Sequence, residues 1–191
     1  MNLPNKLTIA RVCMIPAFVL FLALGMTDFN LTLEAARLAA AAIFVLAAAT
    51  DWLDGFLARK LNQTTDFGKF MDPLADKILV MAALVYMVVL GDIPPWVLIL
   101  TESREFIIAG VRMVAANKNI VIAAGLWGKL KTVAQMIMIP VVLIDVQQPQ
   151  FAPLFRWAGL ILIMLSVALT IVSAVDYIWK NRDAFKEGVK P

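Results

Sequence analysis

The sequence contains no histidine and a single cysteine, Cys13, among its 191 residues. A lone cysteine excludes an intramolecular disulfide. Because zinc and most iron sites need nitrogen or sulfur ligands, the same shortage excludes a protein built around such a site. Charged residues make up only 16% of the chain, and the net charge of +3 is too small to indicate binding to nucleic acid.

Apolar residues are abundant, at 62% of the chain, which is typical of an integral membrane protein. We predict an all-α fold: one domain over residues 1–191, a bundle of six transmembrane helices. A short interfacial segment over residues 2–11, too polar to span a membrane, would precede the bundle. Each predicted span has about the twenty residues that a bilayer core requires. The spans are 7–24, 33–59, 70–90, 94–115, 126–144 and 153–179.

Basic residues are distributed unevenly between the two predicted ends of the bundle. Many, including Lys6, Lys60 and Lys118, fall on one side, whereas Arg37 and Arg156 alone flank the other. By the positive-inside rule, both termini and the connection between the second and third helices face the cytoplasm. An even number of helices agrees with this orientation.

One stretch concentrates the carboxylates: DWLDGFLARKLNQTTDFGKFMDPLAD. Asp51 and Asp54 fall at i and i+3 on one helix, and Asp72 and Asp76 fall at i and i+4 on the next. The polar residues 62–65 between them predict a short loop, so the two helices should be antiparallel neighbours. The two pairs of carboxylates would then face each other.

Four clustered carboxylates in an apolar protein repel one another unless they take up protons or bind a cation. Mg²⁺ and Mn²⁺ prefer oxygen ligands, and two such ions about 3.5–4 Å apart suit phosphoryl-type displacement. Gly55 and Gly68 leave room for a substrate against the helix backbone. Arg59 can bind a phosphate with two parallel hydrogen bonds.

These residues belong to a longer pattern, Asp51-x2-Asp54-Gly55-x2-Ala58-Arg59-x8-Gly68-x3-Asp72-x3-Asp76. The pattern resembles the signature of the CDP-alcohol phosphatidyltransferases. The runs NLPNKLTIAR, SREFIIAGVR and GKLKTVAQ resemble the branch of that family that makes phosphatidylglycerophosphate. The resemblance implies transfer of the phosphatidyl group from CDP-diacylglycerol to sn-glycerol 3-phosphate, with release of CMP. It also implies a homodimer in the bacterial inner (plasma) membrane, among membrane lipids.

The resemblance implies a role for each residue of the pattern. Two divalent cations, Mg²⁺ or Mn²⁺, would be held by Asp51, Asp54, Asp72 and Asp76. Asp76 would also act as the general base that deprotonates the acceptor hydroxyl. CDP-diacylglycerol would contact Asp51, Asp54, Gly55, Ala58, Arg59 and Gly68.

A second charged group lies in the predicted fourth and fifth helices. Arg104 and Arg112 are eight residues apart and share a helix face, and Lys129 and Lys131 begin the fifth helix. Charges are expensive in lipid and should face a cavity or each other. We predict that these four residues bind the phosphate of sn-glycerol 3-phosphate.

Several alternatives stay open. Glu102 or Glu105 can pair with Arg104 for packing alone, leaving Lys129 and Lys131 as ordinary membrane-surface anchors. A sister phosphatidyltransferase acting on phosphatidylglycerol, an inositol phosphate or serine would need the same carboxylates. From another class, a divalent-cation transporter can use membrane carboxylates, although nearby arginines and lysines would repel its cargo.

Overall fold

The computed structural model of the protein describes residues 3–27, 31–61, 66–117, 125–144 and 152–180, without the side chains of 3–7, 52–70 and 117. Over these residues the chain forms six α-helices and no strand, which confirms the predicted all-α class and the number of helices. The helices are α1 (Leu3–Gly25), α2 (Leu33–Leu61), α3 (Asp66–Val89), α4 (Pro95–Asn117), α5 (Leu126–Leu143) and α6 (Ala152–Lys180).

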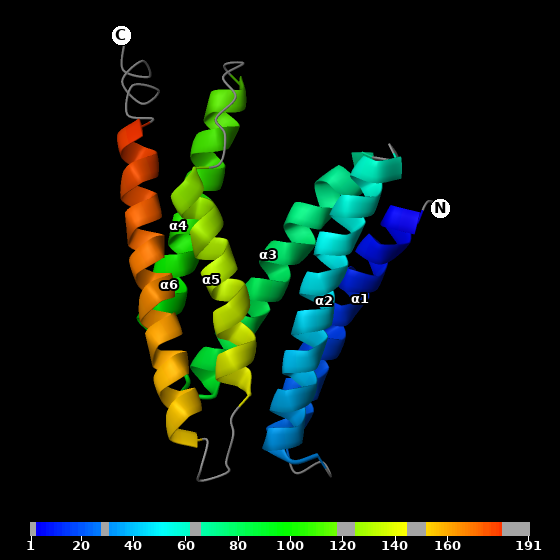
Figure 1. The fold of residues 1–191 in the computed structure, drawn as a ribbon, viewed down its shortest axis with the longest axis vertical. Coiled ribbons are helices and arrows are strands. Elements are labelled where there is room, and N and C mark those ends of the chain that lie inside the picture. Colours follow the sequence, from blue (N-terminus) through cyan, green and yellow to red (C-terminus); the bar gives the residue numbers. More distant parts are fainter. Residues whose placement is uncertain (1–2, 28–30, 62–65, 118–124, 145–151, 181–191) are drawn as a thin grey trace.

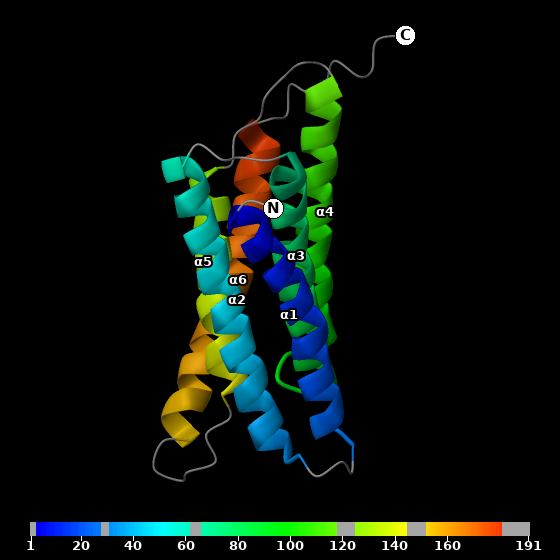
Figure 2. The same ribbon diagram turned by 90° about the vertical axis from the view of Figure 1, so that its right-hand side faces the viewer.

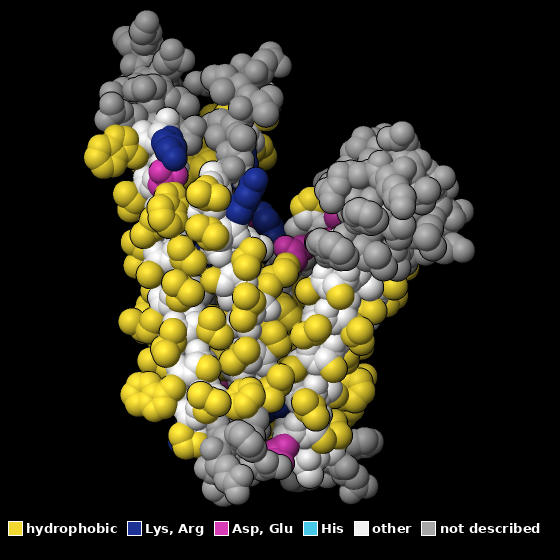
Figure 3. All heavy atoms as spheres, in the orientation of Figure 1, with side chains coloured by type: hydrophobic (Ala, Val, Ile, Leu, Met, Phe, Trp, Pro, Cys, Tyr) yellow, Lys and Arg dark blue, Asp and Glu magenta, His cyan; other side chains and the backbone are white. Residues whose placement is uncertain are grey.

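The helices form two groups that diverge toward one end (Figure 1). One group contains α1 and α2, which pack closely on each other. The other contains α4, α5 and α6, and in it α6 contacts both α4 and α5. Helix α3 contacts helices of both groups. The N-terminal end of α1 and the C-terminal end of α6 lie at the diverging end. The space-filling view shows a hollow between the two groups there, with acidic and basic side chains in it (Figure 3).

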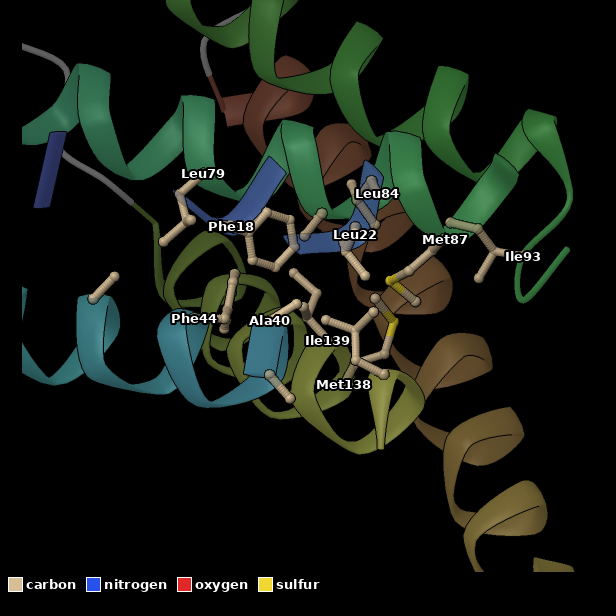
Figure 4. Packing of buried hydrophobic residues seen from close by; sticks show 14 of the residues in the cluster. Phe18, Leu22, Ala40, Phe44, Leu79, Leu84, Met87, Ile93, Met138 and Ile139 are labelled. Atoms are coloured by element: carbon tan, nitrogen blue, oxygen red, sulfur yellow. The ribbon is translucent and has the colours of Figure 1, made fainter. Parts of the chain in front are cut away.

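A continuous apolar core fills the space between the helices (Figure 4). Phe18 of α1 and Phe44 of α2 are fully buried, and their ring centroids lie 6.4 Å apart. Leu84 of α3 and Ile139 of α5 are also fully buried in the same cluster. Between helices in a membrane, close packing of such side chains attracts through van der Waals contacts, because lipid is as apolar as the core itself. The core therefore joins the two groups of helices.

Four helices are long and apolar enough to cross a membrane. The qualifying segments are Thr8–Gly25, Leu33–Asp51, Leu126–Leu143 and Ala152–Lys180. The described parts of α3 and α4 do not qualify, since α3 carries Asp72, Asp76 and Lys77 and α4 carries Glu102, Arg104, Glu105 and Arg112. The structure thus shows a membrane-type helical bundle with four candidate spans among its described residues.

The predicted boundary between an N-terminal interfacial segment and the first helix is absent. The described chain is helical without interruption from Leu3, so most of residues 2–11 form the first turns of α1. Pro4 is tolerated there because proline lacks a backbone N–H, and the N–H groups of the first helical turn have no partner within the helix. The prediction of a separate segment is therefore wrong, and its polar residues extend the helix.

Arg37 ties the groups together at the end opposite the hollow. Its guanidinium donates to the carbonyls of Val142 and Leu143 at 2.9 and 3.1 Å, and its Nη2 lies 3.0 Å from the Asp92 carboxylate. The last carbonyls of α5 have no partner within their own helix. A single buried arginine thus links α2, the end of α5 and the segment between α3 and α4.

Gly25 and Ala36 also bring α1 and α2 together at this end, since a methyl group at Gly25 would collide with the Ala36 side chain.

We expect the substitution Arg37→Ala to lower the free energy of unfolding by about 3–5 kcal/mol, because it removes the cation beside a buried carboxylate. Thermal unfolding in detergent, followed by circular dichroism, measures the change. The matched control is Arg156→Ala, which alters an exposed arginine without an ion pair to any described residue and should change stability by less than about 0.5 kcal/mol. Equal stability of the two variants would contradict this role for Arg37.

Candidate active site

The candidate active site contains carboxylates from two helices that meet at one buried cation. Arg11 of α1 is 1% exposed, and its Nη1 lies 2.8 Å from Asp51 Oδ1 on α2 and 3.6 Å from Asp72 Oδ1 on α3. One guanidinium nitrogen is therefore near both acids. The structure brings Asp51 and Asp72 together, as the antiparallel arrangement of their helices requires.

The first turns of α1 supply the polar groups of this site. The Thr8 hydroxyl donates a hydrogen bond to Asp72 Oδ1 at 2.8 Å, one turn before Arg11 on the same helix face. Figure 2 shows this end of α1 between α2 and α3. Both Thr8 and Arg11 are buried. Thr8 and Arg11 therefore lie within the bundle and complete the carboxylate site.

Asp76 lies one turn beyond Asp72 on α3 and interacts electrostatically with Asp51 and Arg11. The remaining pattern residues, Asp54, Gly55, Ala58, Arg59 and Gly68, belong to the helical backbones of α2 and α3. Their side-chain positions lie outside the described part of the chain. Since α2 continues without a break, Asp54 follows Asp51 by three residues on the same face.

The chemistry of this site fits a hard divalent cation. Its described donors are carboxylate oxygens from Asp51 and Asp72, which suit Mg²⁺ or Mn²⁺ better than a softer metal. The position of Arg11 shows that these oxygens require positive charge. Among the side chains that the structure describes, no three potential ligands lie close enough to hold a metal. A complete set of ligands would thus need further oxygens, and Asp54 is the nearest candidate in sequence.

The second predicted group lines a cavity of about 160 Å³ between α4, α5 and α6. Three of the four predicted phosphate ligands, Arg104, Arg112 and Lys129, are in its wall. Its other lining residues are Glu105, Gly125, Gly128, Thr132, Ser173, Asp176 and Tyr177. A larger cavity of about 630 Å³ lies at the opposite end of the bundle, beside Arg37 and Asp92 and among mostly apolar side chains. The larger cavity has Arg37 and Arg156 in its wall, whereas the smaller one gathers Arg104, Arg112 and Lys129 around a much smaller volume, so the smaller cavity is the candidate for an anionic substrate.

Glu105 lies at the centre of the basic residues. Its Oε1 accepts from Arg104 Nη1 at 2.6 Å and from Lys131 Nζ at 2.9 Å, and its Oε2 lies 3.9 Å from Lys77 Nζ. The pairing of Glu105 with Arg104, which the sequence left open, is thus observed. Lys131 is 2% exposed and does not line the cavity. The structure therefore places Lys131 behind the cavity, in contact with Glu105.

Helix α6 supplies polar groups to the same cavity. The Arg112 guanidinium carbon lies 5.7 Å from the centroid of the Tyr177 ring, a cation–π arrangement. Ser173 accepts a hydrogen bond of 3.0 Å from Arg104 Nε. Asp176 holds Lys180 in an ion pair of 2.8 Å. The cavity therefore has a polar wall on α6 opposite the arginines of α4.

Sequence reasoning missed this wall and also missed Arg11. A signal for the wall exists: Ser173 and Tyr177, which line the cavity, continue a buried stripe that begins with Ser166 and Thr170 outside it, at intervals of four, three and four residues in an apolar helix. That spacing puts hydroxyl groups on one helix face. For Arg11 the local sequence is misleading, because a basic residue in a polar N-terminal run is typical of a membrane-surface anchor.

Comparison with known proteins agrees with the geometry. The family model for CDP-alcohol phosphatidyltransferases matches residues 1–172. A Bacillus subtilis protein named CDP-diacylglycerol–glycerol-3-phosphate 3-phosphatidyltransferase is 43% identical over 196 residues, 97% of each chain. Proteins with the same name from Haemophilus influenzae (40% identity, 99% of this chain and 98% of the relative) and Escherichia coli (39% identity, 93% of each) are also similar. The chain belongs to the CDP-alcohol phosphatidyltransferase family.

Proposed function

We propose that this protein transfers the phosphatidyl group from CDP-diacylglycerol to sn-glycerol 3-phosphate, forming phosphatidylglycerophosphate and CMP. The observation that carries the proposal is the meeting of the α2 and α3 carboxylates at Arg11, within the residue pattern of the family. The names of relatives that match this chain over nearly its whole length support the choice of acceptor. A basic cavity at the same end of the bundle provides a place for the acceptor phosphate.

The residues of the carboxylate site would bind the diphosphate and activate the acceptor. The proposed ligands of two Mg²⁺ or Mn²⁺ ions are Asp51, Asp54, Asp72 and Asp76, and these ions supply charge neutralisation at the diphosphate when bound. Asp76 takes the proton of the acceptor hydroxyl, whose oxygen then attacks the phosphorus that carries the diacylglycerol. The bond from that phosphorus to the CMP oxygen breaks. The proposed contacts to the nucleotide are Gly55, Ala58, Arg59 and Gly68.

The second cavity would hold the other end of the acceptor. Arg104, Arg112 and Lys129 line it, and a phosphate dianion needs this kind of positive charge. Lys131 lies outside the cavity wall and acts on the site by its ion pair with Glu105. An acceptor bound at both places has its phosphate among the arginines and its hydroxyl toward Asp76. This orientation favours attack by that hydroxyl over attack by water.

The membrane arrangement belongs to the same proposal. All six helices would span the inner membrane of a bacterium as one domain, with both termini and the carboxylate site on the cytoplasmic side. The asymmetry of basic residues and the common end of α1 and α6 support this orientation. CDP-diacylglycerol stays in the leaflet while sn-glycerol 3-phosphate and CMP are water-soluble, so the site must be open to both phases. We also propose a homodimer, as the family resemblance implies.

The purified protein should incorporate radiolabelled sn-glycerol 3-phosphate into chloroform-soluble lipid only when CDP-diacylglycerol and Mg²⁺ or Mn²⁺ are present. Chelation with EDTA should stop the reaction, since the carboxylates alone do not neutralise the diphosphate. Serine, an inositol phosphate and phosphatidylglycerol serve as competing acceptors. CMP release with one of these, and none with sn-glycerol 3-phosphate, would overturn the proposed acceptor.

The substitutions Asp72→Asn and Asp76→Asn should each lower kcat at least about a hundredfold, because each removes a carboxylate from the reacting groups. Glu34→Gln is the matched control, since Glu34 is an exposed acid in the first turn of α2, at the far end of the bundle. Turnover is measured by CMP release from detergent-solubilised protein. Wild-type turnover by either Asp variant would refute the role proposed for that residue.

Arg11→Gln should destabilise the protein in EDTA by about 1–2 kcal/mol, because two neighbouring carboxylates, 39% and 35% exposed, lose their cation. Added Mg²⁺ should recover much of this loss if the same carboxylates bind metal. The matched control is Arg37→Gln, which removes a buried arginine from the other end of the bundle. Its destabilisation should be the same with EDTA and with Mg²⁺, and an equal response of the two variants to Mg²⁺ would contradict metal binding beside Arg11.

A further inference from the structure

The guanidinium of Arg104 is held along two of its edges by the protein. Its Nε donates to Ser173 Oγ at 3.0 Å, and its Nη1 donates to Glu105 Oε1 at 2.6 Å. Its side chain is only 10% exposed. The third nitrogen, Nη2, forms no hydrogen bond with a described residue and lies beside Gly128, where an added Cβ would be 3.1 Å away. The protein thus fixes the orientation of this planar group and leaves one edge for a ligand.

Ser173 is itself oriented for this contact. Its hydroxyl donates to the carbonyl of Thr170 at 3.0 Å, so its lone pairs are available to accept from Arg104. The Thr170 hydroxyl in turn donates to the carbonyl of Ser166 at 2.7 Å. All three residues are buried on one face of α6. The hydroxyl that holds Arg104 Nε therefore has a single hydrogen-bonding arrangement.

Glu105 joins Arg104 to the fifth helix. The same Oε1 atom accepts from Arg104 and, at 2.9 Å, from the buried Lys131. Adjacent residues on a helix point about 100° apart. The hydrogen bond between Arg104 and Glu105 therefore requires both side chains to bend toward each other, on the side where Lys131 of α5 lies. Lys131 reaches the cavity only through this carboxylate. The acid thus couples the position of Arg104 to that of α5.

We propose that Ser173 and Glu105 are positioning residues that fix the Arg104 guanidinium for the phosphate of the acceptor. The inference rests on the proposed function and assigns to these two residues a role in acceptor binding. An arginine held in place binds a phosphate without first losing side-chain freedom. Glu105 is the less obvious member, because a carboxylate in an anion-binding cavity lowers its positive charge. Its position is explained if it orients two cations that otherwise repel each other.

The test is the KM for sn-glycerol 3-phosphate of Ser173→Ala, which removes one hydroxyl and no charge. We expect this KM to rise about tenfold, since Arg104 loses one of the two hydrogen bonds that hold it. The KM for CDP-diacylglycerol and kcat should stay within about twofold of wild type. Ser166→Ala is the matched control on the same buried face of α6, because the Ser166 hydroxyl bonds no described side chain. An unchanged KM in Ser173→Ala would overturn the proposal for Ser173.

Glu105→Gln gives a second test, in which two explanations predict opposite changes in the KM for sn-glycerol 3-phosphate. If Glu105 only competes with the phosphate, removing its charge should lower the KM for sn-glycerol 3-phosphate. If Glu105 positions Arg104 and Lys131, the KM should rise about tenfold, because a neutral amide accepts poorly from two cations and its NH₂ group repels them. Glu102→Gln controls for the change in charge, since the Glu102 carboxylate also acts on Lys131 electrostatically but forms no direct ion pair with a described residue. A lower KM in Glu105→Gln would overturn the positioning role of Glu105.

The experiments distinguish failure of the positioning proposal from failure of the proposed reaction. If the wild-type protein makes no phosphatidylglycerophosphate, the proposed function is wrong before any variant is measured. If the wild type is active and both variants keep its KM for sn-glycerol 3-phosphate, the reaction stands and the positioning role is wrong. Circular dichroism and gel filtration of each variant separate a changed KM from misfolding, and Ser173→Ala is the smaller perturbation.

Discussion

The contact between Arg11 and the carboxylates of α2 and α3 is the interaction on which the functional end of the bundle depends. Asp51 and Asp72 are only 39% and 35% exposed, so each carboxylate loses part of its hydration, and the two also repel each other. Arg11 offsets both effects from a third helix. The first turns of α1 are therefore part of the site as well as part of the scaffold, and the polarity of that segment follows from its neighbours in space.

In each of the two charged clusters, one central charge lies between side chains of the opposite charge. At the first, one cation is shared by two acids; at the second, Glu105 is shared by Arg104 and Lys131, with Lys77 nearby. In each cluster the central charge lets like charges lie closer together than they could alone. A substrate that carries phosphate at one position and a reacting hydroxyl at another needs two such clusters side by side. The second cluster is also held by α6, through Ser173.

Much of this arrangement follows from local sequence, and the rest follows from contacts between distant segments. The predicted starts of the second and fifth helices, at Leu33 and Leu126, coincide with those of α2 and α5, because apolar periodicity and turn residues are local signals. The meeting of Asp51 and Asp72 follows from a short connection between two helices. The burial of Arg11 and the retreat of Lys131 behind Glu105 depend on which helix packs against which. Spacing along one helix carries no such information, so the sequence predicts the membrane surface for Arg11 and the wall of a phosphate site for Lys131.

The link at Arg37 has a consequence for how a lipid reaches the site. Helices α2 and α5 are joined through this arginine at one end of the bundle, whereas the two groups diverge at the other (Figure 1). The bundle is therefore closed at the end that holds Arg37 and open at the end that holds the carboxylates. An opening between helices at one end lets a double-chain lipid enter from the side, so that its acyl chains need not pass through water.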